Sequence, residues 1–237
     1  MIKFFRKIRQ KLLSENKLSK YLLYAIGEIV LVVIGILIAL QINTWNERQK
    51  NTAKESVLLK QINSDFRSNK IQLDSIKIAH LKAIEGCDVL LGIMPFKEDK
   101  SVIDTIVKYA PQIFGIKTFN PSNGSVDALI SSSTFDLIQN DSLRNLLVSW
   151  KDVYLDYYEE EQYARNLQIW EIQPFFMDNV DYSNLYSASN LQLLSTPKMN
   201  NIWPNKRGSI QEILNSIKDE RLELYIDEII RLTEGHD

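Results

Sequence analysis

The residues best suited to chemistry are few and widely spaced. The 237-residue chain has two histidines, His80 and His236, and a single cysteine, Cys87. A di-iron bundle needs a glutamate three residues before each histidine, but Lys77 and Thr233 occupy those positions. One thiol excludes both an intramolecular disulfide and a multi-thiolate metal site. Nucleotide-binding, metalloprotease and nucleophile-elbow motifs are absent from the sequence, which therefore predicts no enzyme, no catalytic residue, no metal site and no cofactor.

A second group of residues could bind a ligand without catalysis. Trp150, Tyr154 and Tyr157 recur at helical spacing and are candidate ligand aromatics, although the same stripe suits the core of a helical bundle. Nearby carboxylates could hold a divalent ion with partners elsewhere, but a solvated acidic face is the simpler interpretation. These carboxylates are Asp152, Asp156, Glu159, Glu160 and Glu161.

The elements that position such residues begin with an apolar segment. Between Lys20 and Asn43 lie 22 residues in which Glu28 is the only charge. At 1.5 Å per residue they extend about 33 Å as a helix, enough to cross the hydrocarbon core of a bilayer. The run is longer than the apolar part of a signal peptide, and its end lacks the small residues that signal peptidase reads. We therefore predict an uncleaved transmembrane helix over 21–43, with the lipid bilayer as its first partner.

One face of this segment differs from the rest. On a helical wheel Glu28, Val32, Gly35 and Ala39 fall within about 40° of one line, so small residues share a face with the acid. We predict that this face contacts another membrane helix. Two alternatives are a span that slides outward and leaves Glu28 near the headgroups, and a proton- or ion-handling role for this carboxylate.

Charge sets the expected orientation. Seven basic residues precede the span within the first twenty positions, against four in the twenty that follow Ile42. The positive-inside rule then places the N-terminus in the cytoplasm and the large C-terminal part on the other side of the membrane. Residues 1–20 read as a basic amphipathic helix on the inner leaflet, or as a disordered basic flank. After Ile42 the chain carries 21 basic and 28 acidic residues, which argues against a nucleic-acid partner.

Beyond the span, apolar residues follow a 3-4 spacing without interruption from Leu59 to Met94, just before Pro95. This spacing predicts a helical stalk over 44–94, of the kind found in a coiled coil or long bundle helix. Asn69 and His80 are polar positions of the stripe, and we predict that they fix its register.

The remainder, 95–237, is predicted to form a helical bundle packed with part of the stalk. The fold class is therefore all-α, with a single transmembrane helix, a long stalk and a bundle. The expected elements are helices over 100–109, 126–132, 141–173 and 209–233, with a loop around 115–125 and a long connection over 181–208.

The N-terminal stretch "MIKFFRKIRQKLLSENKLSKYLLYAIGEIVLVVIGILIALQINTWNE" resembles the start of a family of small membrane proteins from flavobacteria and related Bacteroidota, labelled only as a domain of unknown function. A later segment, "SSTFDLIQNDSLRNLLVSWKDVY", resembles the same family more loosely. The resemblance implies a single-pass inner-membrane protein with a periplasmic helical domain. It implies no activity, ligand or catalytic residue.

These observations predict an interaction or scaffold protein that pairs with itself or with another inner-membrane protein. The alternative is a periplasmic small-molecule sensor that signals through a membrane partner.

Overall fold

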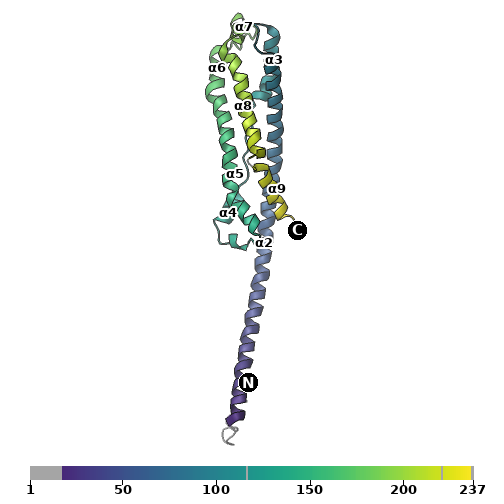
Figure 1. Ribbon diagram of the computed structural model, residues 1–237, viewed down its shortest axis with the longest axis vertical. Coiled ribbons are helices and arrows are strands. Elements are labelled where there is room, and N and C mark those ends of the chain that lie inside the picture. Colours follow the sequence, from purple (N-terminus) through teal and green to yellow (C-terminus); the bar gives the residue numbers. More distant parts are fainter. Residues whose placement is uncertain (1–17, 116, 220, 236–237) are drawn as a thin grey trace. The chain divides into compact units, whose positions relative to one another are not determined.

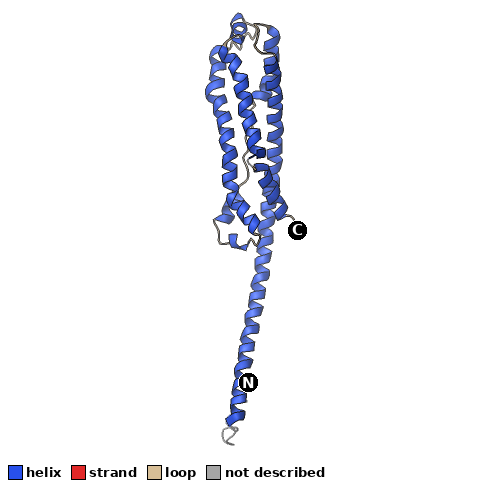
Figure 2. Ribbon diagram, in the orientation of Figure 1, coloured by secondary structure: helices blue, strands red, loops and turns tan. Residues whose placement is uncertain are grey.

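The computed structural model describes residues 18–115, 117–219 and 221–235. Every regular element within these residues is helical, with one short 3-10 helix and one π-helical stretch among the α-helices (Figure 2). The predicted all-α class is therefore confirmed. Of the predicted N-terminal amphipathic helix, residues 1–17 lie outside the described residues, as does His236.

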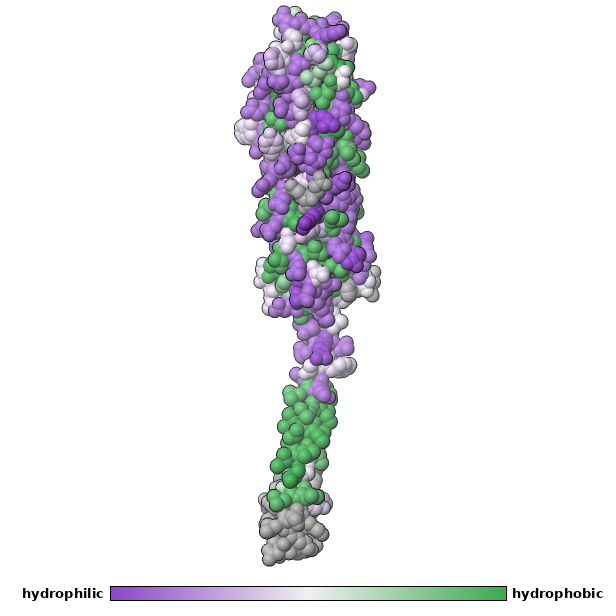
Figure 3. Space-filling view, in the orientation of Figure 1, coloured by the Kyte–Doolittle hydropathy of each residue, from purple (hydrophilic) through white to green (hydrophobic). Residues whose placement is uncertain are grey.

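The chain divides into two compact units, Met1–Glu55 and Ser56–Asp237, and the helix α2 (Leu18–Gly92) contributes to both. In the first unit no described side chain from 22 to 55 is buried. From Leu22 onward the helix is long and apolar enough to cross a membrane. Its apolar part presents a continuous hydrophobic surface (Figure 3). A lone segment of this kind satisfies the length and composition of a membrane span.

The second unit is a helical bundle (Figure 1). Its elements after α2 are α3 (Lys100–Phe114), α4 (Gly124–Ile130), a 3-10 helix (Phe135–Leu137), α5 (Asp141–Asn166), the π-helix η2 (Leu167–Ile172), α6 (Gln173–Asn179), α7 (Ala188–Leu194), α8 (Pro197–Asp219) and α9 (Leu222–Thr233). The helices α5, α8 and α9 pack on one another, while α4 and α7 lie at opposite ends of the bundle.

Two hydrophobic clusters fill this bundle. One joins α2 to α4, α5 and α9, and its centre is an edge-to-face pair of Phe66 and Trp150. The other joins α2 to α3, α7 and α8 around Ile113 and Trp203. Both clusters take residues from the α2 stripe, because its 3-4 spacing keeps them on one face of the helix.

The stripe residues of α2 are buried within this chain's own bundle, except Met94. They are Leu59, Ile62, Phe66, Asn69, Leu73, Ile76, His80, Ala83, Cys87 and Leu90. The sequence pattern thus identified the correct buried face. The partners that cover it in the structure are α3, α4, α5, α8 and α9.

The expectation of a long connection over 181–208 is wrong for most of its length. The structure forms α7 there and begins α8 at Pro197. Proline suits the first turn of a helix, where its missing N–H would have no intrahelical partner. Burial of Ile202 and Trp203 outweighs the weak helix propensity of the neighbouring asparagines and glycine.

The expected helix over 209–233 is in fact the end of α8 followed by α9. Arg221 separates them with a φ of 73°, in the left-handed region that ends helices. Glycine usually occupies such a position, so an arginine there does not indicate a break between two helices.

The expected helix over 141–173 begins where predicted, because the Asn140 side chain accepts a hydrogen bond from the backbone N–H of Leu143. It then changes to the π-helix η2 and resumes as α6. π-Helical turns are rare overall, and those that do occur are frequently found at functional sites. This one lies beside the polar cavity described below.

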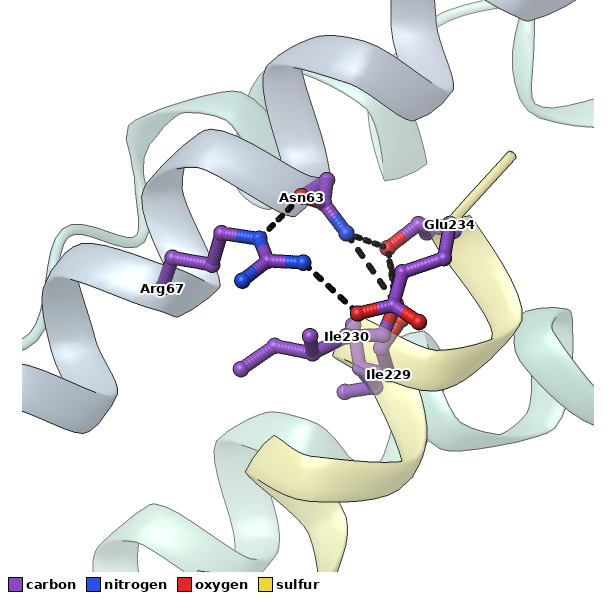
Figure 4. Close-up of polar contacts among 6 residues, drawn as sticks. Asn63, Arg67, Ile229, Ile230 and Glu234 are labelled. Atoms are coloured by element: carbon purple, nitrogen blue, oxygen red, sulfur yellow. Dashed lines mark hydrogen bonds and ion pairs between the residues drawn. The ribbon is translucent and has the colours of Figure 1, made fainter. Parts of the chain in front are cut away.

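A polar clamp fastens the last turn of α9 to α2 (Figure 4). The Asn63 amide donates to the carbonyl of Ile230 at 3.0 Å and to Oγ1 of Thr233 at 2.8 Å. Arg67 donates to Asn63 Oδ1 at 2.7 Å and pairs with Glu234 at 2.6 Å. The final carbonyls of a helix lack intrahelical donors, so Asn63 supplies a cap from a neighbouring helix.

We expect Asn63→Ala to lower the free energy of unfolding by about 1–2 kcal/mol, because Thr233 and the Ile230 carbonyl lose a donor. Urea unfolding of the full chain in detergent, followed by circular dichroism, measures the change. The matched control is Gln61→Ala, whose exposed side chain bonds only Asp65 of its own helix. Equal effects of the two substitutions would show that the clamp adds no stability.

Candidate functional site

The predicted membrane contact face lies in the first unit. Val32, Gly35 and Ala39 are exposed there, and Glu28 is half-buried. A Cβ added at Gly35 would meet no atom within 4 Å. Within the described residues this face is therefore open to a close approach by another helix. Its role as a contact face stays a prediction.

Asn69, predicted to fix register, makes its hydrogen bonds within the bundle. Its Oδ1 accepts from the Ser122 N–H at 2.7 Å, and its amide donates to the Ser122 carbonyl at 3.2 Å. The buried side chain thereby holds the segment before α4 against α2, much as a neighbouring strand would. The N–H and C=O of Ser122 lie outside any helix and find their partners in this side chain.

The three candidate ligand aromatics have different surroundings. Trp150 is 2% exposed and donates its Nε1–H to Asn123 Oδ1 at 2.7 Å. Tyr157 is fully buried, and its hydroxyl donates to Glu161 at 2.8 Å. Two of the three rings therefore belong to the core, and their polar atoms are already engaged. Tyr154 is half-buried and lines a surface hollow between α4 and α5.

The carboxylates of α5 also differ from one another in burial. Asp152, Asp156 and Glu159 are exposed, as a solvated face requires, but Glu161 is only 3% exposed. The expectation of a wholly solvated acidic face is thus wrong for Glu161. Its Oε1 also accepts the Phe119 N–H at 2.8 Å, and these hydrogen bonds compensate its burial. The described residues contain no group of three or more metal-ligating side chains.

A small polar cavity of about 30 Å³ lies between α2, α5, η2 and α8. Lys206 of α8, 5% exposed, reaches into it and donates from Nζ to Oε1 of Gln168 at 2.6 Å. Gln168 belongs to η2 and donates in turn to the Phe114 carbonyl at 2.7 Å. The π-helical turn therefore places an amide that orients a buried ammonium group.

His80 of α2 lines the same cavity. It is 8% exposed, and its Nε2 has no hydrogen-bond partner in the described part of the chain. Burial, and secondarily the charge of Lys206, lower the pKa of His80 to about 4. Burial also lowers the pKa of Lys206 to about 8. At neutral pH the pair is therefore a neutral imidazole beside a largely protonated amine.

Other ionisable groups complete this environment. Glu161 lines the cavity, and burial raises its pKa against the opposing effect of its hydrogen bonds. Lys117 and Arg165 line the cavity from exposed positions. Burial raises the pKa of the Cys87 thiol to about 11, so this cysteine is an inert packing residue at neutral pH.

A larger and mainly apolar cavity of about 190 Å³ lies among α3, α6, α7 and α8. Ile106, Ala110, Phe114, Phe176 and Met199 are among the residues that line it. Its one amide, Asn190, is fully engaged by backbone groups of the segment before α7. The cavity therefore suits an apolar guest.

Sequence reasoning placed Glu161 in the acidic group of α5 without expecting its burial, and it missed Gln168 and Lys206, although a signal existed for all three. Continuing the spacing of the aromatic stripe from Tyr157 gives positions 161, 164 and 168, on the buried face of α5 and η2. Lys206 likewise stands between Trp203 and Ile210 on the buried face of α8. A polar residue within an apolar stripe marks such a site.

Fold and site together define a helical-bundle protein with one candidate membrane helix and a buried cationic cavity. The chain belongs to DUF6090, a family of unknown function, whose profile matches residues 28–182. No curated protein and no solved structure matches the chain. The match covers the apolar helix and the bundle as far as the end of α6.

Proposed function

We propose that this protein is a membrane-anchored interaction protein that acts by pairing helices with itself or with another protein of a bacterial inner membrane. One observation carries the proposal. The apolar segment of α2 lies within 22–55, where no described side chain is buried by the rest of the chain. So large an uncovered apolar surface is stable only in lipid or against a partner.

The distribution of charge supports the orientation. Seven basic residues precede the span and four lie within the twenty positions that follow it, which favours a cytoplasmic N-terminus and a bundle on the periplasmic side. Trp45 follows the apolar run, at the depth where aromatic rings favour the headgroup region. The resemblance to membrane proteins of Bacteroidota agrees with this placement.

The contact surface would be the face that carries Glu28, Val32, Gly35 and Ala39. Small residues four apart allow two helix backbones to approach closely, and a carboxylate is better placed against protein than against lipid.

We expect Gly35→Leu to reduce association at least severalfold in a membrane crosslinking or two-hybrid assay, because the leucine side chain separates the backbones. Gly27→Leu is the matched control, since this glycine lies about 80° away on the helical wheel. Both positions have space for a side chain within the chain itself. Unchanged association of Gly35→Leu, or an equal loss in Gly27→Leu, would contradict the proposed contact face.

The apolar cavity favours a second candidate function, a small-molecule sensor that signals through a membrane partner. The ligand would be an apolar compound held among α3, α6, α7 and α8. Thermal-shift screening of the full chain against apolar metabolites tests this function, with Ala110→Phe as the variant that fills the cavity. A response that persists in Ala110→Phe would place the ligand elsewhere.

A further inference from the structure

We propose that the polar cavity between α2, η2 and α8 binds a small carboxylate anion through the Lys206 ammonium group and His80 Nε2. The proposal is independent of how the membrane helix associates, and it concerns a different cavity from the apolar one.

The first argument is that the ammonium group of Lys206 has more N–H donors than acceptors among the described residues. An ammonium group has three N–H donors, and Gln168 Oε1 takes one of them. No carboxylate of the described residues forms an ion pair with Lys206. A buried charge without a counter-charge is costly. An anion that enters the cavity would pair with the ammonium charge and accept hydrogen bonds from its remaining N–H groups.

The second argument is His80. Its Nε2 is buried and lacks a partner among the described residues, and the residue lines the same cavity as Lys206. With the proton on Nε2 the neutral ring offers one further donor. Two residues with a donor, from different helices, thus line one small space, which suits a group with two acceptor oxygens.

The third argument is the sign of the surrounding charge. Besides Lys206, the lining includes the cations Lys117 and Arg165 and the single acid Glu161. Both hydrogen bonds to Glu161 are made by Oε1, from Phe119 and Tyr157. The lining therefore remains cationic with Glu161 ionised, and more so with it protonated. An anion is favoured over a cation or a neutral guest.

The volume of the cavity restricts the class of anion that it can hold. A cavity of about 30 Å³ has room for roughly two water-sized groups, since one water needs about 10–15 Å³ in this measure. A carboxylate group fills such a space with its two oxygens. The class is therefore a small carboxylate such as formate or acetate. The π-helical turn that supplies Gln168 is the kind of local irregularity found at ligand sites.

The test compares thermal unfolding of the full chain in detergent with sodium formate, sodium acetate or sodium chloride at equal ionic strength. We expect formate and acetate to raise Tm above the chloride value by roughly 5–10 °C at a hundredfold excess over Kd. Lys206→Met, which keeps the length of the side chain, should abolish the difference between carboxylate and chloride. The control Lys97→Met removes an exposed lysine that is not among the lining residues of this cavity, and should retain the difference.

A second variant guards against an effect of Lys206→Met on folding. Gln168→Glu places a carboxylate on the atom that already accepts from Lys206. It should raise Tm without added anion and abolish the response to formate. Histidine-labelled NMR gives an independent readout, because the chain has only two histidines. The His80 resonances should shift saturably with formate in the parent chain and not in Lys206→Met.

Three results would overturn the proposal. One is an equal Tm response to chloride and formate, which would indicate a general salt effect or a halide site. Another is a carboxylate response that survives Lys206→Met. The third is the absence of any saturable shift at His80. Because none of these readouts involves association in the membrane, their failure leaves the interaction proposal untouched.

Discussion

Replacing Trp150 by alanine is expected to lower the free energy of unfolding by about 4 kcal/mol, the range for removing a large aromatic from a packed core. Trp150 packs edge-to-face on Phe66, with ring centroids 4.9 Å apart, and is stacked on Tyr154. Its Nε1–H also fixes Asn123, immediately before α4. The substitution would therefore leave a cavity between α2 and α5 and release the start of α4.

Two further variants separate these effects. Trp150→Phe keeps an aromatic ring but loses the hydrogen bond to Asn123, and should cost about 1–2 kcal/mol. Trp170→Ala is the matched control, since this tryptophan is 72% exposed and should change stability by less than about 0.5 kcal/mol. Urea unfolding of each full-length variant, followed by far-UV circular dichroism, provides the comparison. A loss in Trp150→Ala as small as that in Trp170→Ala would refute the packing role.

Periodicity predicted the parts of this fold that depend on one helix at a time. The stripe from Leu59 to Leu90 is buried as expected, and Asn140 caps α5 as its sequence position suggested. The apolar segment around Glu28 stands out by composition alone. Each of these features depends on residues within a few turns of one another, so the linear sequence contains the information.

The rest depends on contacts between distant segments. The bonds between Asn69 and Ser122, 53 positions apart, follow from the packing of the segment before α4 on α2. The helical state of 197–208 depends on burial of Trp203, which local propensity does not show. The cavity assembles His80, Gln168 and Lys206 from three elements. The sequence shows that these polar residues stand on apolar helix faces. It does not show that they line one cavity.

The second large effect is expected from His80 at acidic pH. Its pKa is about 4 in the folded chain, and about 6.5 when the chain is unfolded. Between these values the unfolded chain binds a proton that the folded chain does not. The stability that depends on neutral His80 is therefore complete above pH 6.5 and is lost as the pH falls toward 4. The full difference corresponds to about 3 kcal/mol.

Other groups that titrate in this range must be separated from His80. Lys206 faces His80 from α8 and stays protonated, while Glu161 and Arg165 of α5 and Lys117 line the same cavity. Burial raises the pKa of Glu161, so this carboxyl group takes up its proton at a higher pH than an exposed glutamate does. Subtracting the free energy of unfolding of a His80 variant from that of the parent chain at each pH removes the contributions that these groups make to both.

His80→Phe keeps a planar ring and cannot titrate, so its stability should fall less steeply than that of the parent chain between pH 6.5 and 4. Lys206→Met should raise the pKa of His80, because it removes the charge that helps to lower it, and should shift the loss to higher pH. The measurement is urea unfolding of the full chain across this pH range, in buffers without small carboxylates. His236→Gln is the control and should follow the parent curve. Parallel curves for the parent chain and His80→Phe would show that the imidazole is as readily protonated in the bundle as in the unfolded chain.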